Sequence, residues 1–132
     1  MSNIKTRTLR QAATFKTTPH EVYEALMDSR KHAKFTGGHA RISRKVGGRF
    51  STYDGYAEGK NVELVPDARI VQTWRASDWP EGHYSQVTLS LATNRTGTRL
   101  TFVQTGIPVE QYEDIKQGWI DYYWKPMKEM LE

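Results

Sequence analysis

The sequence has 132 residues, no cysteine and a formal net charge of +4. This length is typical of a single domain that can bury a core without covalent cross-links, and the lack of cysteine excludes disulfides, thiolate zinc sites and a cysteine nucleophile. The start of the chain lacks the apolar run of a signal peptide, and no later stretch resembles a membrane span. We therefore expect one cytoplasmic domain over residues 1–132.

Charge is distributed unevenly along the chain. Residues 29–53 contain no acidic residue and seven lysines and arginines, whereas the segment after residue 109 is mildly acidic. A basic segment of this kind either attracts an acidic protein face or anionic group, or simply keeps the domain soluble. No zinc-finger, helix-turn-helix or RNA-binding sheet signature accompanies it, so the sequence predicts no specific nucleic-acid function.

The chain is expected to begin with one strand and two short helices. Apolar residues recur at even spacing over 6–15, which predicts a strand. Thr18 then stands at an N-cap position, followed by proline and, three residues on, by glutamate, so a helix should run over about 19–28. A second helix over about 30–35 should end at Gly37.

The middle of the chain is typical of an antiparallel sheet. Apolar and polar residues alternate in short runs that are separated by glycine-, proline- and asparagine-containing turns. We predict strands near 49–53, 62–64, 70–76, 87–91 and 100–103, with turns at 54–55, 66–67 and 94–97.

The last part of the chain predicts one long helix. Ile115, Trp119, Tyr123 and Met127 recur every fourth residue and form an apolar stripe. Pro126 lacks a backbone N–H group and should kink the helix near its end. A sheet with one apolar face has to cover that face, so we predict an α+β fold in which a curved sheet of about six to seven strands wraps around this helix.

Short motifs occur along nearly the whole chain in a specific order. They are Lys34-Phe35-Thr36, Gly47-Gly48-Arg49-Phe50, Leu64-Val65-Pro66, Ile70-Val71, Trp74-Arg75, Trp79-Pro80-Glu81-Gly82-His83, Gly106-Ile107-Pro108, Gln117-Gly118-Trp119 and Tyr122-Tyr123. Their order and spacing resemble the C-terminal domain of the activator of heat-shock protein 90 ATPase family, within the helix-grip (START-like, Bet v-type, SRPBCC) superfamily.

This resemblance implies a helix-grip fold and a non-catalytic, co-chaperone-like domain whose partner is a chaperone of the heat-shock protein 90 type. Other members of the superfamily enclose an apolar cavity for lipids or aromatic compounds, and a few are cyclases or hydrolases. A carrier or sensor of a small hydrophobic ligand is therefore the alternative function.

The residues themselves show no catalytic or metal-binding arrangement. The four histidines, at positions 20, 32, 39 and 83, lack metal-ligand spacing, and no serine lies in a nucleophile elbow. No acidic residue falls on a predicted apolar face, where a buried general acid or base would stand. We expect a protein that is not an enzyme and needs neither metal nor cofactor.

One candidate site is the aromatic and aliphatic inner face between the helix and the sheet. Such side chains either fill the core or line an apolar pocket, and both interpretations remain open. The candidate ligand-binding residues are Phe50, Trp74, Leu89, Phe102, Trp119 and Tyr123.

A second candidate site is a partner-binding surface that combines Lys34 and Arg41 of the basic segment with Trp79, Glu81 and His83. The last three belong to a predicted loop between two strands. A loop tryptophan held by proline and glycine is either an exposed contact anchor or folds back over the rim of the sheet.

Overall fold

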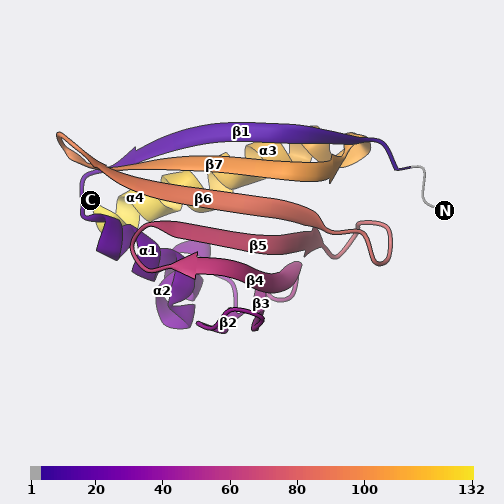
Figure 1. The fold of residues 1–132 in the computed structure, drawn as a ribbon, viewed down its shortest axis with the longest axis horizontal. Helices are drawn as coiled ribbons and strands as arrows, with labels where there is room; N and C mark the ends of the chain where they lie inside the picture. Colours follow the sequence, from indigo (N-terminus) through magenta and orange to yellow (C-terminus); the bar gives the residue numbers. More distant parts are fainter. Residues whose placement is uncertain (1–3) are drawn as a thin grey trace.

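A single curved antiparallel sheet forms the body of the molecule in the computed structural model, which describes residues 4–132 (Figure 1). Across these residues the strand order is β1-β7-β6-β5-β4-β3-β2, so β2 to β7 form a meander and β1 pairs with the last strand. The seven strands are β1 (Thr6–Phe15), β2 (Arg41–Ile42), β3 (Arg49–Thr52), β4 (Ala57–Val65), β5 (Arg69–Ala76), β6 (Ser85–Asn94) and β7 (Gly97–Pro108).

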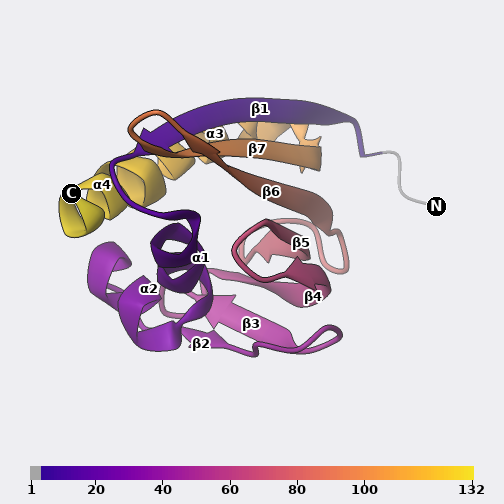
Figure 2. The same cartoon turned by 60° about the vertical axis from the view of Figure 1, so that its left-hand side comes forward.

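Two short helices connect β1 to β2 and lie at one end of the sheet, near the C-terminus of the chain (Figure 2). Helix α1 (Pro19–Met27) begins as predicted, because the Thr18 hydroxyl accepts the N–H of Glu21 at 3.2 Å. Helix α2 (Ser29–Thr36) ends at Gly37, whose φ of 79° suits a residue without a side chain.

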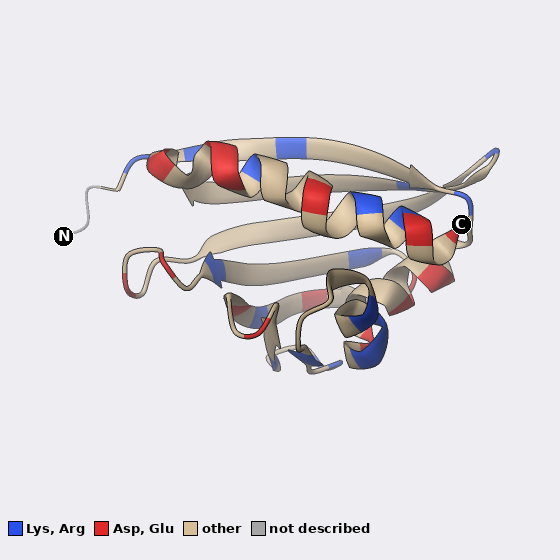
Figure 3. Ribbon diagram, turned by 180° about the vertical axis from the view of Figure 1, so that it is seen from behind, with Lys and Arg blue, Asp and Glu red and all other residues tan. Residues whose placement is uncertain are grey.

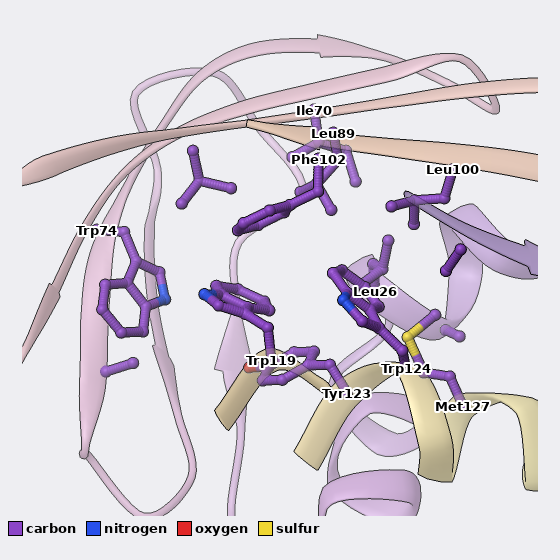
Figure 4. Packing of buried hydrophobic residues seen from close by; sticks show 14 of the residues in the cluster. Leu26, Ile70, Trp74, Leu89, Leu100, Phe102, Trp119, Tyr123, Trp124 and Met127 are labelled. Atoms are coloured by element: carbon purple, nitrogen blue, oxygen red, sulfur yellow. The ribbon is translucent and has the colours of Figure 1, made fainter. Parts of the chain in front are cut away.

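The C-terminal helix runs along the concave face of the sheet, as Figure 1 shows. Its parts are η1 (Val109–Gln111), α3 (Tyr112–Trp119), the π-helical turn η2 (Ile120–Trp124) and α4 (Lys125–Leu131). The predicted stripe of Ile115, Trp119, Tyr123 and Met127 is buried. Figure 4 shows the last three of these side chains between the helix and the sheet. This arrangement confirms the helix-grip fold expected from the sequence.

The irregularity expected at Pro126 takes the form of the π-helical turn that precedes it. The N–H of Lys125 donates to the carbonyl of Ile120, five residues earlier, and Pro126 has no N–H to donate. The wider turn buries Tyr123 and Trp124 together. The four-residue spacing predicted that Tyr123 is buried but did not predict the burial of Trp124.

Strand β4 departs from the sequence prediction, which had Val62 on an apolar face. The strand starts at Ala57, and its pairing with β5 shifts register between Asn61 and Glu63. As a result, Val62 is 49% exposed and Asn61 is buried. The Asn61 side chain donates to the carbonyl of Ser43 at 2.7 Å, so its amide is satisfied within the fold.

Candidate functional site

A pocket of about 520 Å³ lies between the C-terminal helix and the neighbouring strands and turn. Its volume is within the range of small-molecule sites. Side chains from β5, from the β3–β4 connection and from the helix converge on it. The lining residues are Thr52, Tyr53, Tyr56, Ala57, Trp74, Asp114, Ile115, Gln117, Gly118, Trp119, Asp121, Tyr122 and Tyr123.

The structure brings only part of the predicted ligand set to this pocket. Trp74, Trp119 and Tyr123 line it, whereas Phe50 and Leu89 line only an adjacent hollow of about 20 Å³, roughly the space of one water molecule. Phe102 lines neither space; it is fully buried, with its ring centroid 4.5 Å from that of Trp119 (Figure 4). These three outlying residues therefore serve as core.

The mouth of the pocket is shaped by the turn after β3. Tyr53 and Asp54 both have a φ of 57°, a left-handed conformation that is uncommon for a tyrosine. The loop after α2 holds this turn: the His39 N–H donates to the Asp54 carboxylate at 2.8 Å, and the Asp54 N–H donates to the His39 carbonyl at 3.1 Å. A side chain at Gly38 would come within 3.0 Å of the Tyr53 backbone. The close approach fixes Tyr53 at the pocket.

A buried polar pair lies behind the inner wall of the pocket. His32 Nδ1 is 3.1 Å from the Leu26 carbonyl oxygen, which can only accept, so this nitrogen carries the proton. Nε2 then accepts from the Tyr123 hydroxyl at 3.0 Å. Burial lowers the pKa of His32 to about 4 and raises the pKa of Tyr123 to about 12, so both groups are neutral at physiological pH.

A second hydrogen-bonded chain fixes the two tryptophans of the inner wall. Trp119 Nε1 donates to Gln104 Oε1 at 2.9 Å, Gln104 Nε2 donates to Ser85 Oγ at 2.9 Å, and Ser85 donates to the Trp74 carbonyl at 2.7 Å. The sequence analysis missed Gln104. The sequence does contain a pattern that could have revealed it: Gln104 follows Leu100 and Phe102 at a spacing of two residues, which places it on the same inner face of β7.

The predicted partner surface separates into two distant parts. Lys34 on α2 and Arg41 on β2 are exposed at one end of the sheet, where Figure 3 shows basic residues gathered on α2. The loop with Glu81 and His83 joins β5 to β6 at the opposite end (Figure 1). His32, expected within the basic stretch, is buried and uncharged.

Of the two interpretations left open for Trp79, the exposed anchor is wrong and the side chain that folds back is correct. Its side chain is only 4% exposed and its ring centroid lies 5.3 Å from that of Trp74, so it folds back over the rim of the sheet. Arg75 and His83 hold the loop in this position: Arg75 donates to the Trp79 carbonyl at 2.8 Å, and the His83 ring donates to the Gly106 carbonyl at 2.8 Å. Glu81 lies at the tip of this loop and is exposed.

None of the helices within residues 4–132 is both long enough and apolar enough to cross a membrane. No group of three or more histidine, aspartate or glutamate side chains gathers there with the geometry of a metal site.

The gripped helix, the curved sheet and the pocket between them define a helix-grip domain. Residues 16–132 match the family model described as activator of Hsp90 ATPase homolog 1-like protein, and the chain belongs to this family. The resemblance predicted from the short motifs is thereby confirmed.

Similar proteins carry related names. The chain is 36% identical over 115 residues to an activator of 90 kDa heat shock protein ATPase homolog from Dictyostelium discoideum, covering 86% of this chain and 30% of that protein. It is 35% identical over 116 residues to the human homolog 1, covering 88% and 34% respectively. The chain thus spans about a third of the length of these relatives.

A solved structure of similar size supports the same fold. It is an HSP90 activator from Plasmodium falciparum, with a TM-score of 0.87 and 25% sequence identity. The similarity covers 94% of this chain and 95% of that one.

Proposed function

We propose that this chain is a non-catalytic, co-chaperone-like domain that binds a chaperone of the Hsp90 type in the cytoplasm. Two considerations support the proposal. The first is membership of a family whose similar proteins are named as activators of this chaperone's ATPase. The second, which carries the argument from the geometry, is the basic surface formed by α2, β2 and the loop that leads to β3.

The basic surface consists of Arg30, Lys31, Lys34, Arg41 and Lys45. All five side chains are exposed, and none forms an ion pair within residues 4–132. The neighbouring Arg44 is different, because it is paired with Glu24. Unpaired surface cations attract an acidic partner over a distance and increase the rate of encounter.

The experiment is a binding measurement with the host's own Hsp90-type chaperone at several salt concentrations, with the chaperone's ATPase rate followed in parallel. Reversing charge with Lys34→Glu plus Arg41→Glu should slow association by roughly tenfold and flatten its salt dependence, because steering acts on the encounter. Arg10→Glu, an exposed charge on β1, is the matched control and should retain most of the wild-type rate. Undetectable binding of the unchanged domain would refute the proposal.

A second candidate function is supported by the pocket. A volume of about 520 Å³ with six tyrosine and tryptophan side chains among its lining residues is suited to a small hydrophobic ligand, as a carrier or sensor would need. Three of the residues predicted to bind such a ligand line this pocket: Trp74, Trp119 and Tyr123.

A further inference from the structure

We propose that the pocket between the helix and the sheet is a site for a small organic cation, of the quaternary ammonium class with an apolar body. The inference rests on the second candidate function, that the pocket takes a ligand. It is independent of chaperone binding, and the two can therefore fail separately.

The walls of the pocket are aromatic on several sides. Six of its lining residues are tyrosine or tryptophan. The rings of Tyr53 and Tyr122 meet at 74° with centroids 5.3 Å apart, and those of Tyr56 and Trp74 meet at 71° at 6.4 Å. Rings that meet nearly at right angles form the corners of a box, and a cation within about 6 Å of such ring faces is attracted by their quadrupoles.

The charged side chains that line the pocket are all acidic. Asp114 and Asp121 line it, and neither a lysine nor an arginine does. Asp121 is partly neutralised, because Lys125 lies 3.6 Å away and the Gln117 side chain donates to it at 3.0 Å. Asp114 has no ion-pair partner in the described part of the chain.

A third carboxylate, that of Asp78, lies close enough to Tyr56 of the pocket to affect its pKa. Burial is the main reason that the pKa of Tyr56 is raised, and the neighbouring Asp78 and Asp114 raise it further. The phenol therefore stays uncharged at physiological pH. An anionic ligand would be repelled by the Asp114 carboxylate, whereas a neutral apolar ligand would gain nothing from it.

The turn that carries Tyr53 adds a third observation. A tyrosine with a φ of 57° is in a conformation that costs free energy and persists where the surroundings enforce it. Here the contacts of the turn with Gly38 and His39 hold the ring at the mouth, against Tyr122. The box is therefore formed before any ligand arrives, which reduces the cost of binding.

The test uses three probes of nearly the same shape: benzyltrimethylammonium, its uncharged isostere neopentylbenzene, and the anion phenylmethanesulfonate. Each is titrated into the 132-residue chain without chaperone, and the indole N–H signals of the four tryptophans are followed by NMR. We expect the signals of Trp74 and Trp119, which line the pocket, to shift. The cation should bind roughly 2- to 30-fold more tightly than its isostere, the range of cation–π interactions.

Matched variants separate charge from shape. Asp114→Asn should weaken binding of the cation severalfold and leave the neutral isostere unchanged, whereas Glu113→Gln, on the same helix but outside the lining, should change neither. Tyr122→Leu should likewise weaken the cation selectively, with the exposed Tyr84→Leu as control. Equal or tighter binding of the isostere or the anion would overturn the proposal. So would the absence of any shift at Trp74 and Trp119, since the pocket would then be no site for this class of ligand.

Discussion

At the scale of single residues, the interior of this domain depends on a few polar side chains that each find a partner. His32, Asn61 and Gln104 are at most 4% exposed, and each is hydrogen-bonded to a named group in the fold. A buried polar group without such a partner costs about 1–3 kcal/mol. The sequence alone placed His32 in a basic surface segment, because its neighbours are lysine and arginine and nothing local reveals which side of α2 is covered.

The buried imidazole makes stability depend on pH. The pKa of His32 is lowered from 6.5 to about 4 in the folded protein, mainly because burial disfavours the charged form. Between these values the unfolded chain binds the proton and the folded chain does not. The free energy of unfolding should therefore fall as the pH is lowered from 6.5 to 4, by about 3 kcal/mol in all, and should be unaffected by this group above that window.

Urea unfolding at several pH values across this window measures the effect. His32→Gln should remove this part of the pH dependence while lowering stability at neutral pH, because the new side chain packs less well. His39→Gln, which changes an exposed imidazole, should retain the wild-type loss. If the His32 variant loses stability on acidification as steeply as the wild type, the decline has another source.

At the scale of secondary-structure elements, the sequence predicted the long strands and the helix starts and missed the short or irregular pieces. Strand β1 and the inner faces of β5, β6 and β7 have clear two-residue alternation, and most of their buried apolar residues follow it; the buried Gln104 on β7 and Val71 on β5 were not predicted. The first part of β4 was missed because its Gly59 resembles a turn residue. Any side chain there would meet the Thr73 carbonyl oxygen at 1.8 Å, so a glycine is needed where two strands approach closely.

For the candidate site, the sequence predicted the residues of the inner wall but not those of the mouth. Helical spacing and strand alternation point Trp74, Trp119 and Tyr123 inward, which is why they were found. The mouth was not found: the strand predicted over 49–53 ends at Thr52, so Tyr53 lies in a turn, and Tyr122 lies beside the apolar stripe of the helix and not on it. Their proximity depends on how the β3–β4 turn meets the helix, a tertiary contact.

One residue links two elements in a way that can be tested. Asp28 closes α1, where its N–H donates to the Glu24 carbonyl at 2.8 Å, and opens α2, where its carboxylate accepts the Lys31 N–H at 3.0 Å. The latter bond is the main reason that the pKa of this carboxyl is lowered. Asp28→Ala should cost about 1 kcal/mol of unfolding free energy, the usual value of an N-cap. Asp28→Asn keeps the acceptor and should lose only a few tenths. Equal losses in the two variants by thermal denaturation would contradict the capping role.

At the scale of the whole molecule, one side chain ties the helix to the sheet and to the pocket. Trp119 is 6% exposed, its ring centroid lies 4.5 Å from Phe102 on β7 and 5.8 Å from Trp74 on β5, and its indole N–H donates to Gln104. Packing and hydrogen bonding therefore converge at a residue that also lines the pocket. The fold and the binding site cannot be separated at this position.

Trp119→Ala should therefore destabilise the domain strongly. Removing a buried indole costs roughly 3–5 kcal/mol, and the unpaired acceptor of Gln104 adds about 1–3 kcal/mol. A domain of this size has only about 5–15 kcal/mol of stability, so thermal and urea unfolding should show a large loss of stability or no cooperative transition.

Trp119→Phe keeps most of the packing and loses the hydrogen-bond donor, so it should destabilise the domain less than Trp119→Ala does. Tyr122→Leu, three residues along the same helix and 53% exposed in the wild type, should remain within about 0.5 kcal/mol of wild type. An alanine variant that melts at the wild-type temperature would mean that the helix does not hold the sheet through this residue, and the pocket wall built on it would have to be reassigned.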